Sequence, residues 1–370
     1  MKNKSKRKIR YAVVGLGYIS QAAVLPAFRH AARNSELAAL VSDDPVKLKR
    51  LGEKYRVARR FAYEDYDECL RSGDIDAVYL ALPNNLHCEH AVRAAEAGVH
   101  VLCEKPMATT VEECEKMISA AARGRVKLMV AYRLFFERAN LKAIATAKSG
   151  QLGDLRIFNS LFGMQVEAGN TRLQRELGGG TLYDLGIYCI NAARNLFGCE
   201  PIEAFAISAN NGEERFREVD EMTGAVLRFP GERLATFVSS FGSADVSAFE
   251  IVGTKKSLIV EKAYEMVEGK THKLKRKLKE RAARFPKGDQ FAPELGYFSE
   301  CILNDREPEP GGAEGLADVR VIEALYFSAQ SGKSVSLRPL EKSSEPDLEL
   351  ARHRPPVAKP KLVHARAPGG

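Results

Sequence analysis

Residues 11–20 read Tyr-Ala-Val-Val-Gly-Leu-Gly-Tyr-Ile-Ser, an apolar run that ends in a glycine-rich turn. Gly15, Gly17 and Ser20 form a G-x-G-x-x-small pattern. The first glycine of such a pattern permits a tight turn, the second lets the backbone approach a pyrophosphate, and the small third residue lets the helix pack on the strand. Because the pattern follows a strand and opens a helix, it predicts a dinucleotide-binding turn.

Residues 1–130 alternate short apolar strands with helical segments. We expect strands at 10–14, 37–41, 77–82, 100–103 and 128–131, a weaker strand at 60–63, and helices at 21–33, 45–55, 66–72, 86–97 and 111–122. Strands at this spacing with helical crossovers indicate a doubly wound parallel sheet. The first 130 residues therefore predict an α/β Rossmann domain.

The rhythm changes after residue 131. We expect helices at 137–149, 185–196 and 316–329, and strands at 155–164, 203–209, 222–229, 234–240, 248–253 and 257–261. This order predicts an α+β domain over residues 131–338, with a mostly antiparallel sheet and helices on one face. Residues 339–370 are rich in proline and charge, and we expect an extended tail that wraps a partner subunit or stays disordered.

The net charge of +8 comes largely from three basic segments: the first ten residues, residues 270–287 and the tail after Arg352. These segments lack interleaved aromatic residues and any nucleic-acid motif, so we interpret them as solvated termini and one basic surface helix at 270–287. We therefore expect no nucleic-acid partner.

Three kinds of pattern are missing from the sequence. The seven cysteines show no CxxC spacing and the seven histidines no HxxxH spacing, which predicts reduced core thiols and no metal site. No run of about 18 apolar residues is present, so we expect no membrane span. The basic N-terminus has no apolar core or cleavage site, which predicts a cytoplasmic protein.

The end of the second expected strand bears on the choice between NAD and NADP. Residues 41–47 read Val-Ser-Asp-Asp-Pro-Val-Lys. An acid at this position binds the ribose 2′-hydroxyl of NAD and repels a 2′-phosphate, whereas a hydroxyl and a lysine accept that phosphate. Asp43 favours NAD, while Ser42 and Lys47 favour NADP, so the residues alone leave both cofactors open.

Lys105 follows the strand at 100–103, within the sequence His100-Val-Leu-Cys-Glu-Lys-Pro106. Ligands of open α/β sheets bind beyond the carboxyl ends of the strands, which places Lys105 beside the nicotinamide. The alternative is an ordinary surface lysine. A residue before proline is held extended, and its peptide bond takes the cis form more readily than others, which favours a deliberately directed side chain.

Asp184 and Tyr188 lie four residues apart near the start of an expected helix, after Gly178-Gly-Gly. That spacing puts both side chains on one helix face. Tyr188 is a candidate proton donor or acceptor, and a neighbouring lysine would favour its phenolate form. The alternative makes Tyr188 a core aromatic residue and Asp184 a helix cap, and the pattern does not decide between them.

Five segments together resemble the Gfo/Idh/MocA oxidoreductase family over roughly residues 8–340. They are AVVGLGYIS (12–20), AVYLALPNNLHCEHA (77–91), HVLCEKPMAT (100–109), LMVAYR (128–133) and GGGTLYDLGIYCIN (178–191). The Glu-Lys-Pro motif is specific to that family. Tyr188, where many members carry histidine, and the segment 172–177 are similar to the glucose–fructose oxidoreductase branch.

The resemblance implies a Rossmann domain and a second domain with a large open sheet, through which homo-oligomers, either dimers or tetramers, form. It implies that Tyr188 removes the proton of a sugar C1 hydroxyl while hydride passes from C1 to nicotinamide C4. Lys105 would favour the phenolate, and Asp184 would orient the sugar and Lys105. In the branch, NADP(H) is tightly held, and the residues matching Ser42 and Lys47 contact it.

The resemblance also supplies two sets of binding residues. The expected cofactor contacts are Gly15, Gly17, Tyr18, Ser20, Ser42, Lys47, Leu82, Pro83, Asn84, His87, Glu104 and Lys105. The expected substrate contacts are Lys105, Tyr132, Arg133, Arg172, Asp184 and Tyr188.

The predicted function is an NADP-dependent aldose oxidoreductase whose bound cofactor is recycled by a second sugar. One alternative is an NAD-linked polyol or dihydrodiol dehydrogenase that releases its cofactor at each turnover. The other is a non-catalytic regulator that senses NAD(P)H, which would be expected to lack the lysine or the tyrosine.

Overall fold

A six-stranded parallel sheet forms the first part of the molecule. The computed structural model describes residues 7–340, 342, 346–358 and 360–369. The strand order β3-β2-β1-β4-β5-β6 is that of a doubly wound fold, as predicted. The strands are β1 (Ile9–Val14), β2 (Ser35–Val41), β3 (Arg59–Phe61), β4 (Ala77–Leu80), β5 (His100–Glu104) and β6 (Leu128–Ala131). The helices between them are α1 (Leu25–Ala31), α2 (Pro45–Tyr55), α3 (Tyr66–Arg71), α4 (His87–Glu96) and α5 (Val111–Gly124).

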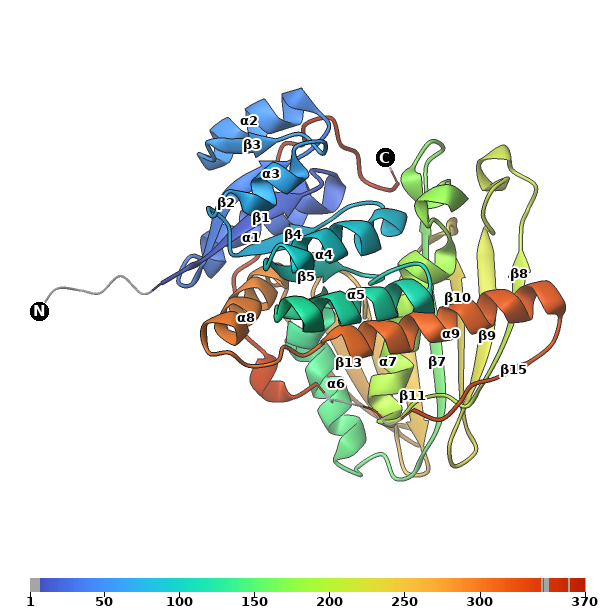
Figure 1. The fold of residues 1–370 in the computed structure, drawn as a ribbon. Helices are drawn as coiled ribbons and strands as arrows, with labels where there is room; N and C mark the ends of the chain where they lie inside the picture. The colour runs from blue at the N-terminus through green and yellow to red at the C-terminus, as the bar shows by residue number, and fades with distance from the viewer. Residues whose placement is uncertain (1–6, 341, 343–345, 359, 370) are drawn as a thin grey trace, which may run out of the picture.

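A nine-stranded, mostly antiparallel sheet forms the second part (Figure 1). Its order is β14-β13-β12-β11-β7-β10-β9-β8-β15, and only β7 and β10 pair in parallel. The strands are β7 (Leu155–Gln165), β8 (Glu203–Ala209), β9 (Met222–Phe229), β10 (Arg233–Ser240), β11 (Gly242–Gly253), β12 (Ser257–Glu261), β13 (Lys270–Arg276), β14 (Lys279–Phe285) and β15 (Val335–Ser336). Helices α6 (Arg138–Lys148), α7 (Ile187–Phe197) and α9 (Gly312–Ser331) lie against one face, and the other face carries exposed side chains. This is the predicted fold class.

Helix α8 (Phe291–Leu303), which the sequence did not predict, returns the chain to the first sheet. The hydroxyl groups of Tyr11 and Ser299 lie 2.8 Å apart, and Asn34 donates to the carbonyl of Gly296 at 2.8 Å. Phe298 of the same helix is fully buried in the core. The helix therefore belongs to the layer that covers β1 and β2, although it follows the second domain in sequence.

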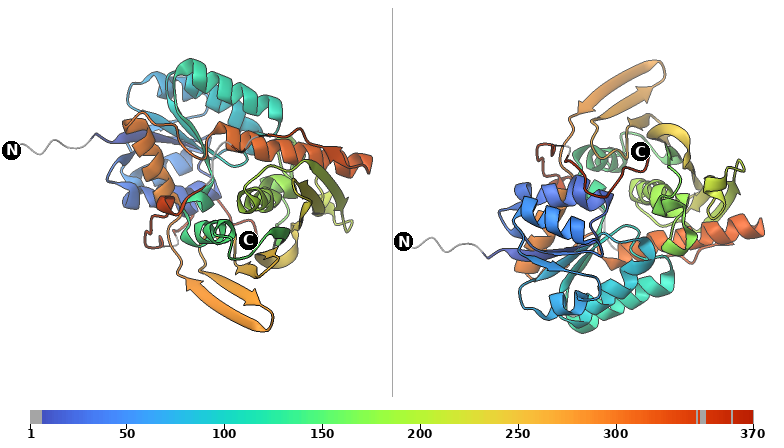
Figure 2. Two further views of the ribbon diagram at one scale, coloured as in Figure 1. Left: turned by 90° about the horizontal axis from the view of Figure 1, so that it is seen from below. Right: turned by 90° about the horizontal axis from the view of Figure 1, so that it is seen from above.

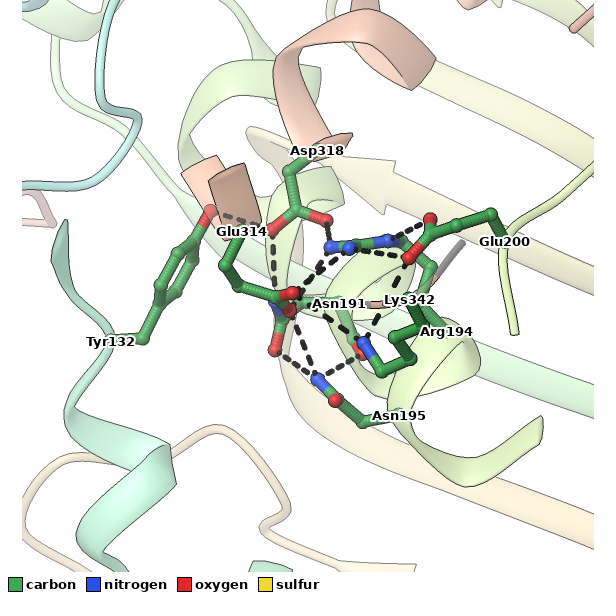
Figure 3. Close-up of polar contacts among 8 residues, drawn as sticks. All are labelled: Tyr132, Asn191, Arg194, Asn195, Glu200, Glu314, Asp318 and Lys342. Atoms are coloured by element: carbon green, nitrogen blue, oxygen red, sulfur yellow. Dashed lines mark hydrogen bonds and ion pairs between the residues drawn. The ribbon is translucent and has the colours of Figure 1, made fainter. Parts of the chain in front are cut away.

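A buried ionic network joins α7 to α9 (Figure 3). Arg194 of α7 donates to Glu200 at 2.6 and 2.8 Å, to Glu314 at 3.0 Å, and also to Asp318. The Arg194 side chain is 1% exposed. Lys342 lies 3.4 Å from Glu314 and closes the network from the chain beyond β15. These contacts hold α7, which carries Tyr188, against α9.

The prediction of a basic helix at 270–287 is wrong. These residues form the hairpin β13–β14, which continues the nine-stranded sheet at its edge and projects from the molecule (Figure 2). The lysine and arginine content favours a helix, but pairing of β13 with β12 overrides that preference. Burial of Lys270 and His272, two residues apart, shows the period of a strand.

Apart from one short turn, the described part of the tail after residue 345 has neither helix nor strand, in keeping with an extended tail, and contact with a partner subunit stays a prediction. Residues 348–350 form a 3-10 turn, and residues 363–369 lie against the chain's own first and second domains. Val363 pairs with Gln21, and Pro368 accepts a hydrogen bond from the amide of Glu167. The described part of the tail is therefore docked on its own subunit.

Candidate active site

A cleft of about 1660 Å³ lies between the glycine loop and the second sheet. Both domains line it, with Gly15 to Ile19 on one side and Arg172, Asp184 and Tyr188 on the other. Pockets for one small ligand usually occupy roughly 300–1,000 Å³. The cleft therefore has room for a dinucleotide together with a second molecule.

The glycine loop fits a bound pyrophosphate. Gly15 has φ +89°, and a Cβ there would lie 2.4 Å from the carbonyl oxygen of Ala81, so only glycine is accommodated. A Cβ at Gly17 would meet no atom within 4 Å, because that residue faces the open cleft. Ser20 is buried, and its hydroxyl donates to the carbonyl of Gly15. A π-helical turn, Ser20–Val24, then begins the helix whose N-terminal amides suit an anion.

Ser42, Asp43 and Lys47 line the same cleft beyond the end of β2. The next acid, Asp44, caps α2 by accepting from the amides of Val46 at 2.8 Å and Lys47 at 3.0 Å. Burial raises the pKa of Asp44, but hydrogen bonds from the Lys47 amide and from His364 outweigh it and lower the pKa overall. Asp44 is thus committed to the helix, while exposed Asp43 stays available to a ligand.

Lys105, Asp184 and Arg172 form a charged cluster inside the cleft. Lys105 Nζ donates to Asp184 Oδ1 and to the Asp184 carbonyl, each at 2.9 Å, and Arg172 Nε donates to Asp184 Oδ2 at 2.6 Å. Burial opposes charge on both partners, yet Arg172 and Lys105 hold the pKa of Asp184 well below its usual range. For Lys105, burial alone would lower the pKa, but the attraction of the Asp184 carboxylate is stronger and raises the pKa above its ordinary value. The lysine is a fixed cation at the end of β5.

Tyr188 lies directly against this cluster. Lys105 Nζ is 4.9 Å and the Arg133 guanidinium carbon 5.0 Å from the centre of its ring. The rings of Phe162 and Tyr264 pack on it at 5.6 and 5.8 Å. Among the described residues none makes a hydrogen bond to the Tyr188 hydroxyl, which leaves it open to a substrate. The structure therefore brings Lys105, Asp184 and Tyr188 together, as the sequence predicts.

Comparison with known proteins decides the family. A model described as "Oxidoreductase family, NAD-binding Rossmann fold" matches residues 9–132, and the "GFO/IDH/MocA C-terminal domain" matches residues 140–259. The NADP(+)-dependent D-xylose 1-dehydrogenase of Haloarcula marismortui is 30% identical, over 89% of this chain and 93% of its own.

The chain belongs to the Gfo/Idh/MocA oxidoreductase family. It is an NAD(P)-dependent oxidoreductase. Two similar solved structures agree with this assignment. An aldose–aldose oxidoreductase from Caulobacter crescentus, solved with glycerol, has a TM-score of 0.85 and 39% identity, covering 90% of this chain and 100% of its own. A 3-ketoreductase from Actinomadura kijaniata, solved with NADP, has a TM-score of 0.80 and 26% identity, covering 87% and 98%.

Most of the remaining predicted contacts of this Gfo/Idh/MocA protein also line the cleft. They are Tyr18, Leu82, Pro83, Asn84, Glu104 and Arg133. Asn84 donates to the carbonyl of Gly178 at 2.7 Å and so links the two domains across the cleft. The Lys105–Pro106 peptide bond is cis. The resemblance to the glucose–fructose branch and the catalytic roles stay predictions.

His87 and Ser20 were expected to contact the cofactor, but neither residue lines the cleft. Each instead supports residues that do line it. His87 is fully buried, with its ring nitrogens 2.8 Å from the carbonyl of Pro106 and 3.1 Å from that of Leu82. Burial lowers the pKa of His87 to about 4. The ring therefore braces the segments that follow β4 and β5.

Tyr132 also differs from its predicted role as a substrate contact. Its hydroxyl donates to Asp318 at 2.6 Å, within the buried network (Figure 3). Burial raises the pKa of Tyr132 well above its usual range. The ring borders a cavity of about 40 Å³ behind Lys105 and Tyr188 and does not line the main cleft.

Arg172 and Arg133 line the cleft, and some of their donors bind other groups of the protein. Arg172 holds Asp184, whereas Arg133 donates to the carbonyl of Tyr264 at 2.6 Å and to Gln290. Their role as substrate contacts stays a prediction.

Several cleft-lining segments carry no strong signal in the sequence. They are residues 162–165, 167–171, 177–180, 264–267 and 364–369. Only the three glycines at 178–180 carry a signal: a Cβ on Gly178 would lie 2.7 Å from side-chain atoms of both Asn84 and Thr109. The other segments lack a glycine pattern or a periodicity that marks a site.

The described residues show no membrane span, no metal site and no disulfide. No helix within the described ranges is long and apolar enough to cross a membrane. Nor do the residues placed by the structure include a group of three or more His, Cys, Asp or Glu suited to a metal. The seven cysteines are free thiols, and five of them are buried. Location in the cytoplasm stays a prediction.

Proposed function

We propose that the protein is an NADP(H)-dependent sugar oxidoreductase that moves a hydride between C1 of a cyclic aldose and nicotinamide C4. The observation that carries the proposal is the contact of Lys105 with both Asp184 and the Tyr188 ring inside a cleft bordered by the glycine loop. Its relatives include a D-xylose 1-dehydrogenase and an aldose–aldose oxidoreductase, which supports a sugar as substrate.

Each residue of the cluster has one role in this proposal. Tyr188 accepts the proton of the sugar C1 hydroxyl, because its own hydroxyl is open and a cation lies against its ring. Lys105 stabilises the phenolate form of Tyr188, which is the form that can accept the proton. Asp184, held by Arg172, keeps Lys105 in place and accepts a hydrogen bond from a second sugar hydroxyl. The nicotinamide, when bound, supplies the hydride acceptor.

Ser42 and Lys47 support NADP as the cofactor, since a hydroxyl and an ammonium group beyond β2 suit a 2′-phosphate. The NADP-dependent relative and the NADP complex of the similar 3-ketoreductase agree with this choice. Exposed Asp43 favours a second candidate, an NAD-linked polyol or dihydrodiol dehydrogenase with an exchangeable cofactor. The regulator is disfavoured because all three catalytic candidates lie together.

A second copy of the chain is the proposed partner, docked on the uncovered face of the large sheet. Six exposed apolar side chains occupy its central strands: Ile157, Leu161, Ile207, Val226, Leu234 and Val238. Leu234 lies beside Ile157 and Val238 beside Leu161 in the β7–β10 pairing, so the rows are continuous. A continuous apolar face is typical of a subunit interface.

The direct test is to purify the protein without added cofactor and record the nicotinamide absorbance. We expect bound cofactor that is reduced by an aldose and reoxidised by a second sugar. An empty protein that needs exchangeable NAD⁺ would favour the second candidate.

Replacing Lys47 tests the choice of cofactor. Lys47→Ala should raise the KM for NADP far more than the KM for NAD, because it removes a cation from the phosphate end. Lys49→Ala, an exposed lysine of the same helix, is the matched control. Equal changes in both KM values would count against a 2′-phosphate contact.

A further inference from the structure

The last described segment of the chain lies across the proposed dinucleotide site. Residues 364–369 line the cleft together with Gly17, Ser42 and Lys47. In Figure 1 this part of the chain passes α2 and β3 and ends beside the second domain. It therefore borders the part of the cleft beyond the carboxyl end of β2, where Ser42 and Lys47 lie.

The first anchor of this segment is Gln21, a buried residue in the turn that follows the glycine loop. The amide of Val363 donates to Gln21 Oε1 at 2.7 Å, and Gln21 Nε2 donates to the carbonyl of Val363 at 2.8 Å. The same Nε2 donates to the carbonyl of Leu16 at 2.9 Å. One side chain therefore holds both the segment and the glycine loop.

Two further anchors lie on opposite sides of the cleft. His364 Nδ1 is 2.8 Å from Asp44 Oδ2, and that oxygen is 4.0 Å from Lys47 Nζ. The carbonyl of Pro368 accepts from the amide of Glu167, in the second domain, at 2.9 Å. The segment thus crosses from one domain to the other. It brings His364 and Arg366 and no acid, a composition suited to a phosphate-bearing ligand.

We propose that residues 363–369 form a strap that closes over bound NADP(H) and retains it between turnovers, an inference that rests on the proposed function. The strap has few anchors, and His364 and Arg366 are exposed, so it opens without unfolding either domain. Cofactor leaves only while the strap is open. The observed release rate is therefore the rate from the open state multiplied by the fraction of open molecules.

Stopped-flow displacement of NADPH from the full-length protein and from a chain lacking residues 363–370 tests the strap. We expect the shortened chain to release NADPH at least about tenfold faster, which corresponds to the loss of one or two net hydrogen bonds of closure. Val363→Pro removes the amide that donates to Gln21 and should give an intermediate rate, whereas Val363→Ala keeps that amide and should match the wild type.

The outcomes separate the strap from the function on which it rests. Release rates within twofold for the full-length and shortened chains would overturn the strap and leave the proposed function intact. Tighter binding by the shortened chain would also overturn it, because the segment would then occupy the site. A full-length protein that binds no NADPH would remove the proposed function and the strap together.

Limited trypsin digestion gives a readout that does not depend on turnover. NADPH should slow cleavage after Arg366, while cleavage after Lys277 in the exposed β13–β14 turn should not change and serves as the internal control. Equal cleavage after Arg366 with and without NADPH would contradict closure over the cofactor.

Discussion

The structure places the ammonium group of Lys105 over the aromatic ring of Tyr188, and the proposed function makes the two residues act as a pair. The sequence predicts their proximity through the strand end at Lys105 and the helical spacing of Asp184 and Tyr188. It could not show that Arg172 holds Asp184, since that contact depends on how the loop at 171–173 folds back. Nor could it show that Tyr132 turns inward to Asp318.

Replacing Tyr188 by phenylalanine should lower kcat by about 10²–10⁴-fold, the usual contribution of a general acid or base. NADPH affinity should change little, since only the hydroxyl is removed. The matched control is Tyr183→Phe, whose hydroxyl donates to the carbonyl of Thr109 at 2.7 Å and should be dispensable for turnover. Steady-state kinetics with an aldose decides the matter, and a Tyr188→Phe enzyme within a few-fold of wild type would show that another group takes the proton.

Asp184→Asn should destabilise the protein in a pH-dependent way. The folded-state pKa of Asp184 lies below its ordinary value of 3.8, so the carboxylate stabilises the fold above about pH 4 and loses that contribution as the pH falls toward the lowered pKa. Urea unfolding of both proteins should therefore give a free-energy difference that is constant near neutral pH and shrinks in acid. A difference that grows in acid would contradict the assignment.

At the scale of elements, the Rossmann strands followed from apolar runs of suitable spacing, because buried parallel strands leave a strong signal in sequence. Helix α8 and the hairpin β13–β14 could not be predicted in this way. Helix α8 packs by long-range contacts with β1 and β2, and the hairpin exists because β12 offers an edge for pairing. Such contacts join residues from different elements of the chain, so a short stretch of sequence does not reveal them.

The network between α7 and α9 should be essential to stability. Arg194→Met should cost about 3–5 kcal/mol in the free energy of unfolding, because it leaves Glu200, Glu314 and Asp318 buried beside each other without their main cation. The control is Arg228→Met, where a half-exposed arginine pairs with Glu203 and should cost no more than about 1 kcal/mol. If a denaturant titration showed the same loss of unfolding free energy for Arg194→Met and Arg228→Met, the network would not be the main link between the helices.

The whole molecule combines a large cleft between its two domains with an uncovered sheet face. We expect a dimer through that face, and Leu161→Glu should convert it to a monomer by burying a charge in the interface. Phe327→Glu changes an exposed apolar residue of α9 and should leave the dimer intact. Light scattering with size-exclusion chromatography measures both, and a wild-type monomer would overturn the expected partner.

The central claim is that hydride passes between C1 of an aldose and the nicotinamide under the control of Tyr188 and Lys105. The most direct measurement supplies NADP⁺ and aldoses deuterated at C1 and then determines the deuterium content of the NADPH by mass spectrometry. We predict reduced cofactor that carries the deuterium, and almost none with Tyr188→Phe. Reduced cofactor without deuterium, or no reduction by any aldose tested, would contradict the account.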